Sequence, residues 1–297
     1  MSRRFGSIPN YPSVLAHPGW THQCTVIAGP CSVESQKQIA VIASELFPMN
    51  PSYLRGGIYR AGTYPPEQFG IVRERIRWLL DAARNRGMKC VVEILDVRLL
   101  DQLGAVDAYQ VGARHMQDYA LLDELSRSEK PVFLKRSMGA TLDELLGAAE
   151  YLVRNGKKNI AMIERGSSTF HNHVRWDLSI SLIAAVKRMT KIPILVDASH
   201  GTGRRDLVEP MTMAGMQAGA DGFLIEAHTD PEKSLTDAEQ AVDIMTAIRI
   251  ANRAHKIYSE VKNEMSHLHA SAMGLRRLPS RAAREDGWLR AMRVRDL

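Results

Sequence analysis

The chain has 297 residues, of which 45% are hydrophobic and 24% charged, a balance typical of a folded globular protein. No apolar stretch approaches the ~18 residues that a membrane-spanning helix needs, and the proline-containing N-terminus lacks the apolar run of a signal peptide. The three cysteines are too few and too uneven for a disulfide framework, so we expect a reducing compartment, the cytoplasm.

Positive charge is concentrated at the C-terminus. The formal net charge is +6, and residues 275–297 hold seven arginines against three acidic residues (+4), which leaves +2 for the rest of the chain. A basic tail could contact nucleic acid, but this one has no nucleic-acid motif and no series of stacking aromatic residues. We therefore expect a solvated, partly helical extension or an oligomer contact, and no nucleic-acid partner.

Short β-rich runs alternate with amphipathic helical patterns along the chain. The expected strands are residues 24–29, 52–57, 89–94, 107–112, 131–136, 159–164, 192–197 and 221–226. The expected helices between them are residues 34–47, 67–87, 118–126, 141–156, 177–189 and 205–219, with Asp118 and Thr141 as the clearest N-caps.

Continuous apolar strands interleaved with helices predict an α/β fold whose parallel sheet is buried on both faces. Eight such units predict a (β/α)₈ TIM barrel. A doubly wound open sheet is the alternative, but no glycine-rich fingerprint follows the first strand. We expect a single catalytic barrel over residues 24–250, a short N-terminal extension over 1–23, and a C-terminal helix with an arginine-rich tail over 251–297.

Ionisable residues stand at the end of every predicted strand, where barrels of this kind carry their chemistry. They are Cys31, Arg55, Glu93 with Asp96, Arg114, Lys135, Glu164 with Arg165, Asp197 with His200, and Glu226 with His228. Any one of them alone is more often structural, as an inert buried cysteine or a local ion pair is. All of them together are difficult to explain as core packing and predict an active site.

These residues form two chemical sets. A thiol, an imidazole and carboxylates are a mixed donor set that suits Mn, Fe, Co or Zn. The candidate metal ligands are Cys31, His200, Glu226 and Asp237. Several cations at one barrel mouth would repel one another unless an anion such as phosphate or carboxylate bound between them. The candidate anion-binding residues are Arg55, Arg60, Arg114, Lys135 and Arg165.

Motifs along the predicted strands resemble one known family. They read IAGPCSVES, LRGG, VGARHMQ, FLKRSMGATLDELLGAAEYL, MIERGSSTF, ILVDASHGTGRRDLV and GADGFLIEAHTDPEKSLTDAEQ. From about residue 24 to about residue 245 the chain resembles the type I, β-subclass 3-deoxy-D-arabino-heptulosonate 7-phosphate (DAHP) synthases. Their superfamily also includes 3-deoxy-octulosonate 8-phosphate synthase. The shared reaction joins phosphoenolpyruvate (PEP) to an aldehyde and releases phosphate.

The resemblance implies a role for each candidate residue. Cys31, His200, Glu226 and Asp237 match the family's ligands of a divalent metal (Mn, Co, Fe or Zn), which polarises the aldehyde. Arg55, Arg60, Arg114, Lys135 and Arg165 match residues that bind PEP. Arg60, Thr63 and Asp237 would lie on the acceptor side, and Lys135, His200 or Glu164 would move protons. The implied activity is the condensation of PEP with erythrose 4-phosphate, the first step of the shikimate pathway, by a cytoplasmic homodimer or homotetramer.

The chain departs from the family pattern on the acceptor side. The family usually has Lys-Pro-Arg-Thr-Ser where this chain has RAGTY, residues 60–64. Gly62 therefore replaces an arginine that binds the phosphate of erythrose 4-phosphate, and Ser168 replaces a second arginine. Either Arg60, Arg136, Arg204 or Arg205 binds that phosphate instead, which we favour, or the enzyme is a paralogue that uses another, for example unphosphorylated, aldehyde. A third possibility, an inactive barrel, is disfavoured by the complete set of candidate ligands.

Overall fold

The computed structural model describes residues 23–59 and 72–275, and side chains only as far as residue 264. Eight parallel strands form a closed barrel in which each strand pairs with the next and the last pairs with the first. They are β1 (Thr25–Gly29), β2 (Tyr53–Arg55), β3 (Lys89–Ile94), β4 (Ala108–Val111), β5 (Val132–Lys135), β6 (Ile160–Glu164), β7 (Ile194–Asp197) and β8 (Gly222–Glu226). The predicted (β/α)₈ barrel is confirmed.

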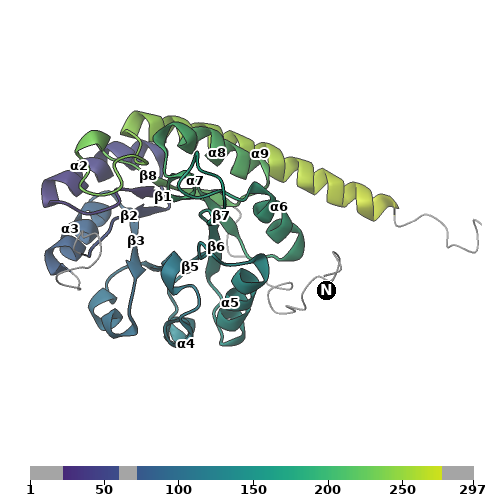
Figure 1. The fold of residues 1–297 in the computed structure, drawn as a ribbon, viewed down its shortest axis with the longest axis horizontal. Helices are drawn as coiled ribbons and strands as arrows, with labels where there is room; N and C mark the ends of the chain where they lie inside the picture. The colour runs from purple at the N-terminus through teal and green to yellow at the C-terminus, as the bar shows by residue number, and fades with distance from the viewer. Residues whose placement is uncertain (1–22, 60–71, 276–297) are drawn as a thin grey trace, which may run out of the picture. The chain divides into compact units, whose positions relative to one another are not determined.

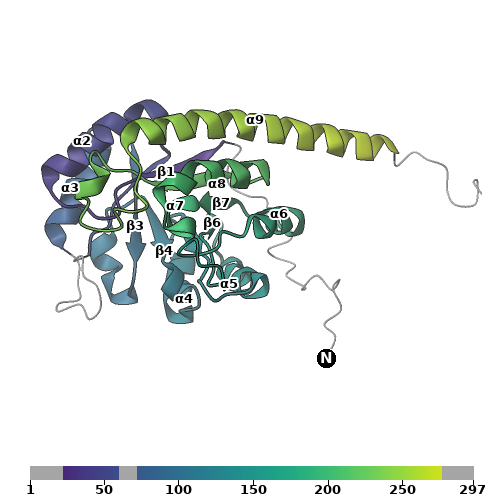
Figure 2. The same cartoon turned by 45° about the horizontal axis from the view of Figure 1, so that its top comes forward.

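Helices surround the strands, as Figures 1 and 2 show. They are α2 (Gln36–Leu46), α3 (Arg73–Arg84), α4 (Tyr119–Arg127), α5 (Leu142–Arg154), α6 (Ile180–Met189), α7 (Ala198–Thr202) and α8 (Arg205–Gln217). A long helix, α9 (Ile244–Leu275), follows the last strand. The chain divides into two compact units, Met1–Tyr258 and Ser259–Leu297, with the division inside α9. The barrel belongs entirely to the first unit. The domain limits expected from the sequence stay a prediction.

Local sequence signals start the helices where expected. The Asp118 carboxylate accepts a hydrogen bond from the backbone N–H of Leu121 at the start of α4. Thr141 and Glu144 form a reciprocal capping box at the start of α5. Both satisfy backbone N–H groups that a helix N-terminus otherwise leaves without a partner. Helix α7 was not predicted, because its five residues are too short to show a helical period.

The core has two layers. Inside the barrel, every strand contributes to one small cluster: Ile27, Tyr53, Val91, Ala108, Phe133, Ala161, Ile163, Leu195 and Leu224. The Tyr53 and Phe133 rings meet edge to face, with centroids 5.2 Å apart. A larger apolar layer packs the outer faces of the strands against the helices. The inner cluster fills the barrel, so a ligand can enter only at an end.

Helix α8 lies unusually close to strand β7. A Cβ atom at Gly215 would lie 2.7 Å from Cγ2 of Val196 and 2.8 Å from its Cβ, which is closer than real carbon atoms approach. Glycine at this position therefore sets the distance between the helix and the sheet.

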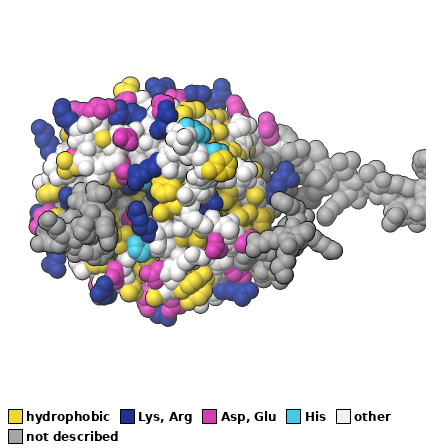
Figure 3. Space-filling model, in the orientation of Figure 1, with side chains coloured by type: hydrophobic (Ala, Val, Ile, Leu, Met, Phe, Trp, Pro, Cys, Tyr) yellow, Lys and Arg dark blue, Asp and Glu magenta, His cyan; other side chains and the backbone are white. Residues whose placement is uncertain are grey.

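Surface charge is balanced locally on the face shown in Figure 3, where basic and acidic side chains are interspersed over the described part of the chain. Within the described residues, no helix is both long and apolar enough to cross a membrane.

Candidate active site

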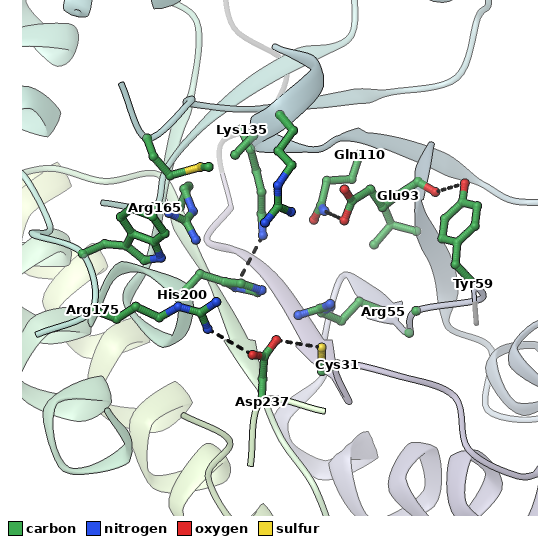
Figure 4. Close-up of a pocket in the computed structure, with 17 residues that line it drawn as sticks. Cys31, Arg55, Tyr59, Glu93, Gln110, Lys135, Arg165, Arg175, His200 and Asp237 are labelled. Atoms are coloured by element: carbon green, nitrogen blue, oxygen red, sulfur yellow. Dashed lines mark hydrogen bonds and ion pairs between the residues drawn. The ribbon is translucent and has the colours of Figure 1, made fainter. Parts of the chain in front are cut away.

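A cavity of about 250 Å³ opens at the C-terminal ends of the strands (Figure 4). Its wall includes most of the site residues predicted from the sequence. These are Cys31, Arg55, Arg114, Lys135, Arg165, His200 and Asp237. Predicted residues Arg60 and Thr63, together with Gly62 and Tyr64, lie outside the described residues.

Alternation of side chains along the strands decides which strand-end residues reach the cavity. In β5, Phe133 faces the barrel interior, so Lys135, two residues later, faces the same way and enters the cavity. In β6, Ile163 faces the interior, so Arg165 enters the cavity while Glu164 points away from it.

Glu164 is fully buried and holds residues that lie behind the cavity wall. Its carboxylate accepts hydrogen bonds from Nη1 of Arg136 at 3.1 and 3.2 Å and from the backbone N–H groups of Gly166 and Ser179. Burial raises the pKa of Glu164, although Arg136 opposes this shift. These contacts fix the loop that follows β6 and leave Glu164 outside the cavity wall.

Three of the four predicted metal ligands form one cluster, and the fourth, His200, contacts one of them. Donor atoms of Cys31, Glu226 and Asp237 are within 4.8 Å of one another, and Sγ of Cys31 is 3.1 Å from Oδ2 of Asp237. Nε2 of His200 lies 3.2 Å from Oε1 of Glu226. Cys31 follows β1, Glu226 ends β8, and the short helix α7 presents His200. Because β1 pairs with β8 in the closed barrel, residues that follow the first strand and end the last strand meet in one cluster.

The charge state of this cluster suits a cation. Burial, and after it the negative charge of Glu226, raises the pKa of the Cys31 thiol well above its ordinary value. Burial alone would raise the pKa of Glu226, but His200 and Arg55 hold it below its usual range. Without a cation the thiol keeps its proton and donates a hydrogen bond to Oδ2 of Asp237. A divalent metal stabilises the thiolate instead, so the donor set fits a metal such as Mn, Fe, Co or Zn.

A second buried group orients His200. Asp197, at the end of β7, lies 2.9 Å from Nδ1 of His200 and 2.9 Å from Nζ of Lys135. Burial opposes ionisation of Asp197, but His200 and Lys135 lower its pKa below the ordinary range. The aspartate therefore holds one ring nitrogen of His200, and the other ring nitrogen faces Glu226. Such a carboxylate contact is usual behind a ligating histidine.

Two cations in the cavity wall have no acidic partner among residues 23–59 and 72–264, namely Arg114 and Arg165. Arg165 is only 7% exposed, its guanidinium lies 5.2 Å from the ring centroid of Trp176, and its Nη1 has no hydrogen-bond partner within those ranges. Burial lowers its pKa. A buried guanidinium without an acceptor is costly, so this geometry favours an anionic ligand. Arg55, in contrast, donates from Nη1 to Glu226 at 2.5 Å.

Arg175 is a cavity residue that the sequence did not single out. It belongs to the loop between β6 and α6, its Nη1 donates to Oδ1 of Asp237 at 3.2 Å, and its side chain is 56% exposed. The signal available was its place in the strand-end loop that also contains Arg165. Glu93 and Gln110 complete the opposite wall, with a hydrogen bond of 3.4 Å between them.

Three of the arginines suggested as replacement phosphate ligands have acidic partners. Arg136 pairs with Glu164, Arg204 with Asp206, and Arg205 with Glu232. None of the three belongs to the cavity wall. Ser168 is exposed.

Comparison with known proteins identifies this (β/α)₈ barrel as an enzyme. The chain belongs to the DAHP synthetase I family, whose model matches residues 14–263. It is 37% identical over 253 residues to a phospho-2-dehydro-3-deoxyheptonate aldolase of Thermotoga maritima, covering 85% of this chain and 71% of that protein. It is 25% identical to a 2-dehydro-3-deoxyphosphooctonate aldolase of Desulfotalea psychrophila, covering 86% of this chain and 96% of the relative.

Solved structures agree with the family assignment. The crystal structure of the Thermotoga maritima DAHP synthase matches with a TM-score of 0.76 and 35% identity, covering 80% of this chain and 70% of that one. A truncated form of the Thermotoga maritima enzyme matches with a TM-score of 0.74 and 35% identity, covering 80% and 88%.

Proposed function

We propose that the protein condenses PEP with erythrose 4-phosphate to give DAHP and phosphate. C3 of PEP forms a bond with the aldehyde carbon, water adds to C2, and cleavage of the C–O bond releases phosphate. The observation that carries the proposal is the pairing of two features in one cavity. The guanidinium of Arg165, whose Nη1 has no hydrogen-bond partner among the described residues, faces the same space as the Cys31–Asp237 donor pair.

Binding of PEP falls to the cations of the wall. In the part of the chain that the structure describes, Arg114 and Arg165 lack acidic partners, and guanidinium groups suit phosphate and carboxylate because they donate two parallel hydrogen bonds. Lys135 adds a third charge, at 2.9 Å from Asp197. Arg55 lies in the same wall but has its charge balanced by Glu226. We assign PEP to Arg114, Lys135 and Arg165, with Arg55 holding Glu226 and Arg60 as a further predicted contact.

The residues that would hold a divalent metal are Cys31, His200, Glu226 and Asp237. When bound, the metal supplies Lewis-acid polarisation of the aldehyde carbonyl. Gln240 donates to Oε2 of Glu226 at 2.6 Å and Arg175 donates to Asp237, so both carboxylates are oriented by hydrogen bonds.

Proton transfer is assigned to Lys135. Its Nζ lies in the cavity wall, 3.4 Å from Nδ1 of His200, where it can donate to a departing phosphate oxygen. His200 is kept as a ligand that Asp197 orients. Glu164 supports Arg136 outside the cavity, which favours a positioning role for it.

The alternative acceptor, an unphosphorylated aldehyde, is favoured by one observation. Arg136, Arg204 and Arg205 are paired with acids away from the cavity, so they offer no second phosphate site there. Within the described residues, Arg175 is the wall cation beside Asp237.

The test is phosphate release from PEP by the metal-loaded protein, with erythrose 4-phosphate or with erythrose, each with and without a chelator. We expect chelator-sensitive turnover with erythrose 4-phosphate. Turnover with erythrose alone would favour the alternative acceptor, and no phosphate release with either aldehyde would contradict the proposed reaction for these acceptors.

A further inference from the structure

The predicted metal ligands come from loops that are far apart in the sequence. Cys31 lies in the loop of residues 30–35 between β1 and α2, and Asp237 lies in the loop of residues 227–243 between β8 and α9. Their side chains meet at 3.1 Å although 206 residues separate them. Such an approach requires the two loops to be fixed to each other.

Glu34 connects these loops. Its Oε1 accepts a hydrogen bond of 2.8 Å from the backbone N–H of Leu235, and its Oε2 lies 3.6 Å from Nε2 of His228. Glu34 stands three residues after Cys31, Leu235 two residues before Asp237, and His228 two residues after Glu226. One carboxylate therefore makes contacts close to three of the four predicted ligands.

Several other contacts of the loop of residues 227–243 lie away from Leu235, such as the hydrogen bonds from Arg205 to the carbonyls of Ala238 and Ala241. The Leu235 side chain is 66% exposed, so apolar burial does not fix the loop there. Asp237 has a φ of 52°, a left-handed conformation that costs energy for a residue other than glycine. A hydrogen bond of 3.0 Å between Thr236 and Ser32 lies beside the Glu34 contact. The strained backbone at Asp237 is thus held by the N–H groups of Gln240 and Ala241, which donate to its carbonyl, and by these hydrogen bonds to the opposite loop.

His228 adds a second reason for the carboxylate. It is 4% exposed, and its Nε2 has no hydrogen-bond partner among the described residues. Glu34 is the acidic group that faces this nitrogen. Removing the carboxylate would leave the imidazole buried without a polar neighbour on that side.

We propose that Glu34 is a positioning residue that holds Asp237 and Cys31 in register for the metal. The proposal rests on the metal site of the proposed function. Partners behind the ligands of a metal typically change its affinity by about 10- to 100-fold when they are removed, and we expect an effect of that size for Glu34.

The experiment is a Co²⁺ titration of the metal-free full-length protein, followed by the near-ultraviolet absorption of the cobalt–thiolate bond. Glu34→Ala removes the acceptor, whereas Glu34→Gln keeps an oxygen for the N–H of Leu235. Glu45→Ala is the matched control, because Glu45 is an exposed glutamate of α2. We expect Glu34→Ala to bind Co²⁺ about 10- to 100-fold more weakly, and the other two variants to bind nearly as the wild type does.

Equal affinity in Glu34→Ala and wild type would overturn the proposal, as would an equal loss in Glu45→Ala. If circular dichroism shows that Glu34→Ala is unfolded, Glu34→Asp takes its place. Its shorter side chain withdraws the carboxylate from Leu235, and it must show the same weakening. Absence of the cobalt–thiolate band in the wild type would instead refute the metal site itself. If all variants bind Co²⁺ as expected but the wild type shows no aldol activity, only the proposed reaction is refuted.

Discussion

Arg165 combines burial, an aromatic contact and a nitrogen, Nη1, that has no hydrogen-bond partner in the described structure. Replacing it with Met keeps most of the packing against Trp176 and removes the donors. Because a hydrogen bond to a charged group contributes about 1.5–3 kcal/mol, we expect Arg165→Met to raise the KM for PEP by roughly 10- to 100-fold. Steady-state kinetics with varied PEP would measure this change. Arg77→Met, at an exposed position of α3, is the control, and an unchanged KM in Arg165→Met would argue against Arg165 as a PEP ligand.

Lys157, which lies away from the cavity, should make the stability of the protein depend on pH. It is 2% exposed, donates to the carbonyl of Ser128, and burial lowers its pKa from 10.5 to about 8. Between these two values the unfolded chain binds the additional proton, so the wild type gains stability as pH rises. Relative to Lys157→Met, we expect a gain of about 1 kcal/mol between pH 7 and pH 9. Urea unfolding at both pH values measures it, and a difference that does not change with pH would contradict the prediction.

The sequence predicts which residues stand at the strand ends better than it predicts the directions in which their side chains point. Cys31, Lys135 and Arg165 enter the cavity as expected, but Glu164 does not, because it follows an interior residue by one position and not by two. Glu34 carried no signal, since its carboxylate depends on a backbone N–H from a loop about two hundred residues away. Contacts of that kind become visible only once the barrel is closed.

At the scale of elements, the approach of α8 to β7 is the most testable contact. Alanine favours helices over glycine by about 1 kcal/mol, but at Gly215 the added carbon would meet Val196, and overpacking typically costs about 1–3 kcal/mol. We expect Gly215→Ala to lower the free energy of unfolding by about 1 kcal/mol.

Denaturant melts of Gly215→Ala, Val196→Ala and the double variant test this contact. The double variant should be more stable than the sum of the single changes predicts, because the smaller residue at 196 leaves room for the new carbon. Gly139→Ala is the control, since nothing lies within 4 Å of a Cβ atom at that position. If the stability changes of the two single variants simply add up in the double variant, the steric explanation is wrong.

The strands were predicted well. Each strand lies within two residues of its expected bounds, because parallel strands buried on both faces read as continuous apolar runs. Helix α7 was missed, although it presents His200. A single turn capped by Asp197 has no period to detect, and the capping aspartate was read only as a strand-end charge.

At the scale of the whole molecule, metal binding should raise the thermal stability of the protein. A ligand present at 100 times its Kd adds about 2.7 kcal/mol to the folded state, which for a domain of this size raises the Tm by roughly 5–10 °C. We expect the wild type to show such a rise with Mn²⁺ or Co²⁺ relative to a chelator, measured by differential scanning fluorimetry. Cys31→Ala should lose most of the rise. An equal rise in both proteins would exclude Cys31 as a ligand.

The pairing of β1 with β8 has a consequence for synthesis. Cys31 leaves the ribosome 206 residues before Asp237, and chains generally fold from the N-terminus as they emerge. The nascent protein therefore carries the Cys31 thiol before Glu226 and Asp237 have been made. If the predicted ligands hold a metal, they can do so only after β8 has been released and has closed the barrel, so metal uptake would report closure of the barrel.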